Sequence, residues 1–274
     1  MTKPNDWEGR TGKGWAAEWR RTDRSWGGLT DQLLRHTRDF TFDTVLDIGC
    51  GAGELSLAIA RGRPNAAVLG VDISAELIEV ANERGQNLPN VGFTLGDAAS
   101  WSPPDAFTPD FLISRHGVMF FEDPVGAFTQ LAQLSAPGAG MLFSCFRGPA
   151  ENEIFSAIGS LLPPPATKPD PHAPGPMAFA DPDRVRGILT QAGWGAVNFT
   201  PFDFAMVAGA GEDPVEEAVA YFRSIGAAAA ASADMEPAER EALFEKIRAF
   251  VASRERNGLI AFGAATWIVT ARRD

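Results

Sequence analysis

The feature that most constrains this 274-residue chain is a glycine-rich turn that follows an early apolar segment. The run Val45–Glu54 places three alternate glycines after a β-branched strand that carries an acid, Asp47. Glycine adopts positive φ angles at little cost and lets a ligand approach the main chain. The helix expected at 54–60 would present free N–H groups at its N-terminus, where anionic groups bind. The pattern therefore predicts a cofactor-binding loop at the carboxyl end of a parallel strand.

The spacing of this turn separates two kinds of cofactor. A dinucleotide-binding turn has the pattern G-x-G-x-x-G, whereas Glu54 stands here where the third glycine is required. A carboxylate at Asp47 would repel a pyrophosphate and attract a cationic amino group. The turn instead resembles the first motif of the class I S-adenosylmethionine-dependent methyltransferases. The resemblance implies that Asp47 reaches the amino group of the cofactor's methionine, through water or directly, while the glycines pass beneath the cofactor.

A second acid lies at the end of the next predicted strand. The run 68–73 contains Asp72, which follows Gly53 by 19 residues. A βαβ unit places a carboxylate on ribose hydroxyls at about this distance. Ser74 then fits the N-cap of the following helix. The alternative is that Asp72 itself caps this helix, and one residue could serve both purposes. Without the later acids, the glycine turn would also fit an ordinary strand-to-helix connection.

A third predicted strand, within 91–98, also ends in an acid. The methyltransferase resemblance implies that Asp97 accepts a hydrogen bond from the adenine amino group and that the N–H of Ala98 meets a ring nitrogen. Three successive strands that end in carboxylates predict a cofactor site more strongly than one glycine turn does. The residues expected to contact S-adenosylmethionine are Asp47, Gly49, Cys50, Gly51, Gly53, Asp72, Ile73, Asp97, Ala98 and Arg115.

The fourth predicted strand, 110–114, leads into a loop that contains His116. In the methyltransferases that the chain resembles, this loop lies beside the transferable methyl group. The ordinary pKa of histidine, about 6.5, suits a general base, so His116 is the predicted catalytic residue. The alternative is a loop histidine that only bonds the backbone or caps a helix. The residues predicted to bind the acceptor are Met119, Phe120 and His172, with core packing as the alternative for the first two.

Strands and helices alternate through 43–146, which predicts an open parallel sheet with helices on both faces. A sixth strand at about 196–204 and a last strand at 259–270 complete this sheet. The predicted fold class is α/β. We expect a Rossmann-like sheet of seven strands, mostly parallel, with an antiparallel last strand as in the methyltransferases that the chain resembles.

Two domains are predicted: an N-terminal helical cap, 1–40, and a class I methyltransferase domain, 41–274. The second includes a proline-rich loop at 147–180 and a helical insert at about 205–257. In many proteins that the chain resembles, the N-terminal segment closes over the cofactor. The alternative is that its tryptophans pack the segment onto the sheet. Four of the chain's seven tryptophans lie in this cap: Trp7, Trp15, Trp19 and Trp26.

Composition argues against several other classes of protein. The net charge of −11 disfavours a large nucleic-acid interface, which needs clustered Lys and Arg. Cys50 and Cys145 have neither a disulfide framework nor a metal-ligand spacing, so we expect no metal and a cytoplasmic location. The N-terminus does not resemble a secretory leader. Pro137 and three glycines interrupt the uncharged run 124–146, so no membrane association is expected.

These observations predict an S-adenosylmethionine-dependent methyltransferase that acts on a small molecule. With 19 Phe and one Tyr, the chain favours an apolar pocket and therefore an apolar or aromatic acceptor. The sequence leaves open whether oxygen, nitrogen or carbon is methylated, and it leaves the oligomeric state open. The alternative is a module of the same fold that binds the cofactor without methyl transfer. A nicotinamide oxidoreductase is disfavoured by Glu54.

Overall fold

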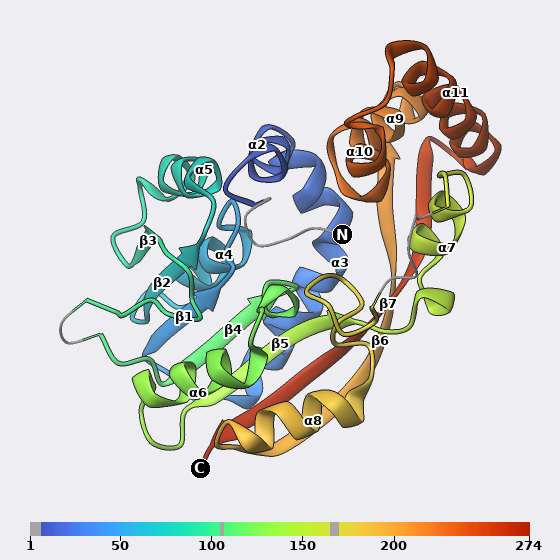
Figure 1. Cartoon of the computed structure of the whole chain (residues 1–274). Helices are drawn as coiled ribbons and strands as arrows, with labels where there is room; N and C mark the ends of the chain where they lie inside the picture. Colours follow the sequence, from blue (N-terminus) through green and yellow to red (C-terminus); the bar gives the residue numbers. More distant parts are fainter. Residues whose placement is uncertain (1–6, 105–106, 165–169) are drawn as a thin grey trace.

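The structure is a computed structural model in which residues 7–104, 107–164 and 170–274 are described. At its centre lies a seven-stranded sheet with the order β3-β2-β1-β4-β5-β7-β6 (Figure 1). β7 runs antiparallel to its neighbours β5 and β6, and the other strand pairs are parallel. The predicted fold class is therefore confirmed. The strands are β1 (Thr44–Ile48), β2 (Ala67–Asp72), β3 (Val91–Leu95), β4 (Phe111–Arg115), β5 (Gly140–Phe146), β6 (Trp194–Ala210) and β7 (Leu259–Arg273).

Helices cover both faces of the sheet, as the alternation of side chains along its strands requires. In β4, Phe111 and Ile113 belong to the apolar cluster that contains Leu29 of α3. Leu112, between them, belongs to the other cluster with Phe128 of α6. No described helix is both long and apolar enough to cross a membrane. The α-helices are α2 (Arg10–Ala17), α3 (Trp19–His36), α4 (Glu54–Gly62), α5 (Ala75–Gly85), α6 (Pro124–Leu134), α7 (Glu153–Gly159), α8 (Pro182–Gln191), α9 (Pro214–Ser224), α10 (Gly226–Ser232) and α11 (Pro237–Arg254), and the 3₁₀ turns are η1 (Thr37–Asp39), η2 (Val118–Phe120) and η3 (Pro149–Glu151).

The N-terminal cap consists of α2 and the long helix α3, which reaches two other parts of the molecule. Leu29 and Leu33 of α3 are fully buried against the sheet. Farther toward its N-terminus, Arg21 and Arg24 form ion pairs with Glu217 of α9, with N–O distances of 2.7 and 3.2 Å. The cap is therefore joined to the sheet at one end and to the helical insert at the other.

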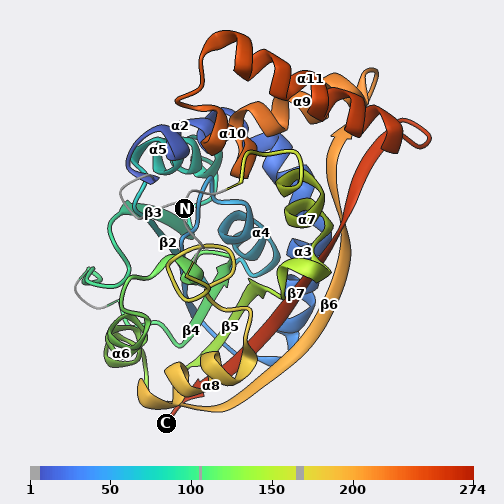
Figure 2. The same cartoon turned by 45° about the vertical axis from the view of Figure 1, so that its right-hand side comes forward.

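The last two strands extend past the rest of the sheet. We expected the sixth strand to end at 204 and the insert to begin at 205, but β6 continues to Ala210, which pairs with Leu259 of β7. Met206 and Ala208 are fully buried in this extension, because α9 packs against it. Figure 2 shows the long β6–β7 ribbon leading from the sheet to α9, α10 and α11. The helical part of the insert therefore begins at Pro214.

The proline-rich stretch 147–180 is only partly a loop. It contains η3 and the helix α7, and residues 165–169 lie outside the described residues. The buried side chain of Asn152, just before α7, holds this stretch on β7. Its amide nitrogen donates to the carbonyl of Ala265 over 3.0 Å, and its amide oxygen accepts from the N–H of Ala265 over 2.9 Å. This pairing fixes where α7 stands relative to the sheet.

Candidate cofactor and acceptor site

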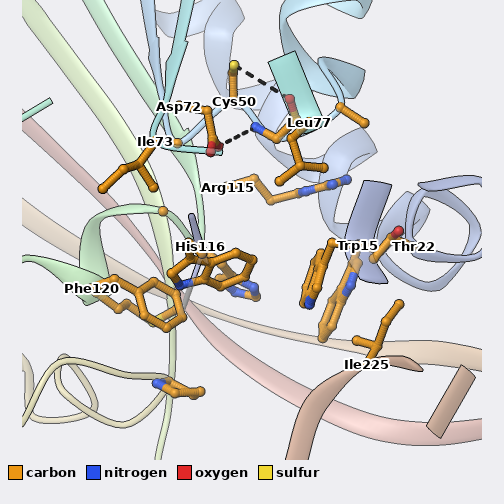
Figure 3. A pocket seen from close by; sticks show the side chains of 18 of the residues that line it. Trp15, Thr22, Cys50, Asp72, Ile73, Leu77, Arg115, His116, Phe120 and Ile225 are labelled. Carbon is orange, nitrogen blue, oxygen red and sulfur yellow. Dashed lines mark hydrogen bonds between the residues drawn. The ribbon is translucent and has the colours of Figure 1, made fainter. Parts of the chain in front are cut away.

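A cavity of about 260 Å³ lies where β1, β2 and β4 end, the usual place for a ligand in an open α/β sheet. Its lining also includes residues of α2, α3, α7 and the α9–α10 insert. Figure 3 shows Asp72 and Cys50 at one end of this cavity and Phe120, Trp15 and Ile225 at the other, with Arg115 and His116 between them. We call these the cofactor end and the acceptor end.

The three glycines of the turn all have positive φ, but they serve different purposes. Gly49, Gly51 and Gly53 have φ values of 64°, 55° and 83°. A Cβ atom on Gly49 would lie 2.9 Å from the Cα of Gly117, and one on Gly53 would lie 2.8 Å from the ring of Phe93. A Cβ atom on Gly51 would meet nothing within 4 Å. Gly51 also lines the cavity, so its missing side chain leaves room for a ligand, whereas the other two glycines allow packing.

Asp47 places a buried carboxyl group at the cofactor end. It is 1% exposed and accepts a 2.5 Å hydrogen bond from the Ser56 hydroxyl. Burial raises the pKa of this carboxyl to about 6, although Ser56 and the positive charge of Arg115 act in the opposite direction. Asp47 has no ion-pair partner among the described residues. A cationic ligand group would therefore stabilise its ionised form.

Asp72 holds the glycine turn and the start of α5 together. One carboxylate oxygen accepts from the N–H of Gly51 at 2.8 Å, and the other accepts from the N–H of Ser74 at 2.9 Å. Burial raises the pKa of this carboxyl despite these bonds. The N-cap of α5 is Ser74, whose hydroxyl accepts from the N–H of Leu77. Asp72 lines the cavity, and each of its oxygens keeps a lone pair for a ligand hydroxyl.

Asp97 and Ala98 follow β3 and also line the cavity. Asp97 is exposed and accepts a 2.9 Å hydrogen bond from the N–H of Ala99, which holds the carboxylate near the backbone. Ala98 is buried, and Ile73 lines the same end of the cavity. The structure thus brings together all the predicted cofactor residues except Gly53, which packs behind the turn.

Arg115, at the end of β4, is the only Lys or Arg among the described residues that line the cavity. Its guanidinium forms an ion pair with Glu54 and donates to the Thr30 hydroxyl at 2.7 Å. Glu54 is the residue that stands in place of the third glycine of a dinucleotide fingerprint. Its side chain therefore has a structural use, since it holds the guanidinium of Arg115 in place.

His116 lies between the two ends of the cavity in an unusual conformation. Its φ is 62°, which is uncommon for a residue other than glycine. The imidazole packs 4.1 Å from the ring of Phe146 and 5.4 Å from that of Trp26, measured between ring centroids. Its Nε2 is buried without a hydrogen-bond partner among the described residues. The pKa near 6.5 expected from the sequence is wrong for this environment, because burial, and secondarily Arg115, lowers the pKa of His116 to about 3.

The other predicted acceptor residues divide into two groups. Met119 and Phe120 line the cavity from η2, although Met119 is also 1% exposed and part of the core. His172 is exposed and is not among the residues that line the cavity. The proline-rich stretch reaches the cavity through Pro176 instead. The turn in this stretch places His172 on the outer surface, where its backbone N–H donates to the carboxylate of Asp170.

Comparison with known proteins shows what this chain is similar to. Residues 45–138 match the family model described as a methyltransferase domain. A malonyl-[acyl-carrier protein] O-methyltransferase of Halalkalibacterium halodurans is 32% identical over 120 residues, which make up 43% of this chain and 44% of that protein. A trans-aconitate 2-methyltransferase of Methylobacterium radiotolerans is 36% identical over 94 residues, 34% of each protein.

The fold comparison agrees and extends over the whole chain. Phosphoethanolamine N-methyltransferase 2 of Haemonchus contortus, solved with S-adenosyl-L-methionine, superposes with a TM-score of 0.57 and 17% identity. That match covers 100% of this chain and 60% of the nematode chain. Residues 45–138 are therefore similar to methyltransferase domains, and the fold is that of class I S-adenosylmethionine-dependent methyltransferases. The chain spans less than half the length of the first two curated relatives.

The cavity also contains residues that sequence reasoning missed. Most of them are apolar and lie at the acceptor end. They come from the cap, from α7 and from the insert: Trp26, Ile154, Phe155, Ile158, Tyr221, Phe222 and Ile225. The tryptophan-rich cap was one available signal, and Trp7, Trp15 and Trp26 do line the cavity. The residues of α7 and α9 belong to no motif, since only the tertiary fold brings them to the strand ends.

Proposed function

We propose that the protein transfers a methyl group from S-adenosylmethionine to a small apolar or aromatic acceptor. One observation carries this proposal. A single cavity joins the strand-end acids and the glycine turn at one end to a wall of aromatic side chains at the other. The arrangement provides a polar site for a cofactor and an apolar site for an acceptor, with the boundary at His116.

The residues present fit the cofactor. The ionised form of Asp47, buried without an ion-pair partner in the described structure, suits the cofactor's ammonium group. Asp72 is assigned to the ribose hydroxyls, and Asp97 with the N–H of Ala98 to the adenine ring. We assign Arg115 to the cofactor's carboxylate, because it is the cationic side chain of the lining. The open space above Gly51 leaves room for the cofactor's body.

S-adenosylmethionine, when bound, supplies a methyl group on a sulfonium whose leaving group is neutral. The protein's own contribution is mainly to hold the acceptor in line and to exclude water, and orientation of this kind contributes up to roughly 7–11 kcal/mol in model systems. A hydroxyl or ammonium acceptor must also lose a proton. We assign that proton to His116, whose buried Nε2 has no hydrogen-bond partner among the described residues. The pKa of about 3 keeps the imidazole neutral but also makes it a weak base in the unliganded protein.

The other parts of the molecule support a small-molecule acceptor. The net charge of −11 disfavours nucleic acid. We propose that α2 and α3 act as a cap over the site, since Trp7 and Trp15 line the cavity.

We also propose a cytoplasmic location, because Cys50 and Cys145 are both free. The acceptors named for the curated relatives, malonyl-acyl carrier protein and trans-aconitate, belong to proteins that this chain matches only in part.

The proposal is tested by following release of S-adenosylhomocysteine from S-adenosylmethionine across a panel of small acceptors. We expect acceptor-dependent release with at least one apolar or aromatic hydroxyl or amine compound. Calorimetry with S-adenosylhomocysteine supplies the control for binding. Tight binding of this product without turnover of any acceptor would instead support a cofactor-binding module of the same fold, and absence of binding would contradict both functions.

A further inference from the structure

We infer, on the basis of the proposed function, that the acceptor is an uncharged aromatic molecule and that the site rejects carboxylates and phosphates. The inference follows from where charged side chains lie along the cavity. The four lining aspartates and Arg115 belong to the cofactor end or to the ion pairs beside it. The described residues at the acceptor end include no Lys, Arg, Asp or Glu.

An anionic acceptor would find no free cation in the described lining. The guanidinium of Arg115 is already held by Glu54 and Thr30, and its remaining capacity is assigned to the cofactor's carboxylate. Asp23, which also lines the cavity, is bound by Arg84 at 2.6 Å. A charge that is buried without a partner is strongly disfavoured. The acceptor end therefore selects against an acid.

A cationic acceptor would lack a counter-ion for the same reason. Among the described lining residues beyond the cofactor end and its ion pairs, the ionisable side chains are His116 at the boundary and Tyr221 at the acceptor end, and burial keeps both of them neutral at physiological pH. It lowers the pKa of His116 to about 3 and raises the pKa of the Tyr221 hydroxyl. Asp47 and Asp72 lie at the other end, where the cofactor's own positive charges need them. An uncharged acceptor can bind this surface without a buried charge that lacks a counter-ion.

The shape of the wall indicates an aromatic ring. Two groups of edge-to-face or tilted rings line the cavity, with centroid distances of 4.1 to 5.7 Å. Rings in such contacts leave faces and edges on which a further ring packs favourably. The first group is Trp7, Trp15 and Phe120, and the second is Trp26, His116 and Phe146.

Two neutral nitrogen atoms in these groups have no hydrogen-bond partner among the described residues. Trp7 Nε1 and His116 Nε2 are buried and make no hydrogen bond within the described structure. Native proteins rarely leave such atoms unpaired. An indole N–H only donates, so its partner is an acceptor atom such as a carbonyl, ether or hydroxyl oxygen. The acceptor is therefore expected to carry an oxygen atom that accepts from Trp7, and the absence of a free cation in the described lining favours a neutral oxygen.

The test compares pairs of compounds in which a carboxylate is replaced by its neutral methyl ester. Methyl 4-hydroxybenzoate is titrated against 4-hydroxybenzoate, and methyl 6-hydroxy-2-naphthoate against its free acid, at pH 7 into protein saturated with S-adenosylhomocysteine. Quenching of tryptophan fluorescence and calorimetry report binding. We expect at least one ester to bind at least tenfold more tightly than its acid. Equal or tighter binding of the acids, or binding of no member of either pair, overturns the inference.

A second test changes the charge of the protein instead of the charge of the compound. Ile154 of α7 is half-buried and lines the acceptor end. Ile154→Lys should reduce the preference for ester over acid by tenfold or more, whereas the matched uncharged control Ile154→Gln should keep it. Retained binding of S-adenosylhomocysteine shows that the variants fold. An unchanged preference in Ile154→Lys contradicts the inference, while loss of S-adenosylhomocysteine binding by the wild type contradicts the proposed function itself.

Discussion

The two ends of the one cavity are built in opposite ways. The cofactor end comes from short, contiguous segments at the ends of three neighbouring parallel strands. Asp47 lies near the end of β1, Asp72 is the last residue of β2, and Asp97 follows β3. Backbone hydrogen bonds hold Asp72 in place. The acceptor end is assembled from side chains of the cap, η2, α7 and the α9–α10 insert, which lie far apart in the sequence.

This difference shows how one fold separates a fixed task from a variable one. Parallel strands that end at the same edge position polar groups by backbone geometry alone, so the cofactor end depends on few residues. The acceptor end depends on tertiary packing of apolar side chains, which tolerates substitution better than a hydrogen-bonded turn does. Variants at the two ends should therefore separate cofactor binding from acceptor binding.

The largest effect is expected at the boundary residue, His116. His116→Asn keeps a residue that tolerates the left-handed backbone conformation, while His116→Phe keeps an aromatic ring. If His116 takes the proton, turnover should fall about 10²–10⁴-fold, and affinity for S-adenosylhomocysteine should hardly change. Because burial lowers its pKa to about 3, the wild-type rate should show no acid limb from His116 between pH 5 and 8. Turnover within a few-fold of wild type in both variants would remove the base assignment.

The next largest effect is expected at the cofactor end. Asp47→Ala removes the buried carboxylate assigned to the cofactor's ammonium group. A charge-assisted contact is worth about 1.5–3 kcal/mol, so calorimetry should show S-adenosylhomocysteine binding weaker by tenfold or more. Asp203→Ala, at an exposed acid of β6, is the control and should leave binding unchanged. Wild-type affinity in a folded Asp47→Ala protein would contradict the assignment.

The same residue gives a pH dependence with a definite sign. The pKa of Asp47 is raised from 3.8 to about 6 in the folded protein, so its ionised form is disfavoured there. Above pH 6 the ionised Asp47 should lower the free energy of unfolding of the unliganded protein by about 3 kcal/mol. As the pH falls toward 4, the carboxyl becomes protonated and this stability should return. S-adenosylhomocysteine affinity should change in the opposite direction and weaken below pH 6. Asp47→Asn should raise Tm at pH 7.5, and identical pH profiles in both proteins would refute the linkage.

A smaller effect is expected from the aromatic wall. Phe155 of α7 lines the cavity and packs against Phe146, with ring centroids 4.9 Å apart. Phe155→Ala should weaken acceptor binding about tenfold through lost apolar contact and leave S-adenosylhomocysteine binding unchanged. Phe199→Ala, at a half-buried ring of β6 outside the cavity, serves as the control in the same fluorescence titration. Equal losses for cofactor and acceptor would mean that the two ends are not separable.

The smallest effect is expected where the cap meets the insert. Glu217→Gln weakens the ion pairs with Arg21 and Arg24. Partly exposed pairs contribute about 0–1 kcal/mol, so Tm should change by a few degrees at most and acceptor affinity by no more than a few-fold. Glu241→Gln breaks a more exposed pair, with Arg223 alone, away from the cap. If Glu241→Gln weakens acceptor binding as much as Glu217→Gln does, the ion pairs between α3 and α9 have no special part in positioning the cap.

The sequence was sufficient for the parts of the site that local geometry determines. The sheet, the strand-end position of Asp72 and the N-cap role of Ser74 were predicted from patterns within a few residues. Gly49, Gly51 and Gly53 were predicted as one group, yet they differ in what their missing side chains allow, because their neighbours Gly117 and Phe93 are distant in sequence.

The acceptor end could not be predicted in the same way. The environment of His116 is made by Trp26 and Phe146, from the cap and from β5, so its lowered pKa could not be read from its loop. His172 was expected to reach the site, but the turn at 171–179 leaves it exposed. The extension of β6 to Ala210 depends on pairing with β7 some fifty residues later and has no local signal beyond an apolar pattern.

The central claim is that the strand-end acids and the glycine turn form a site for S-adenosylmethionine. It is tested most directly by calorimetric titration of the purified protein with S-adenosylhomocysteine and, side by side, with NAD⁺. The account predicts saturable binding of one S-adenosylhomocysteine per chain, at least a hundredfold tighter than any binding of NAD⁺. Binding of NAD⁺ with equal or higher affinity, or no binding of S-adenosylhomocysteine, would contradict it.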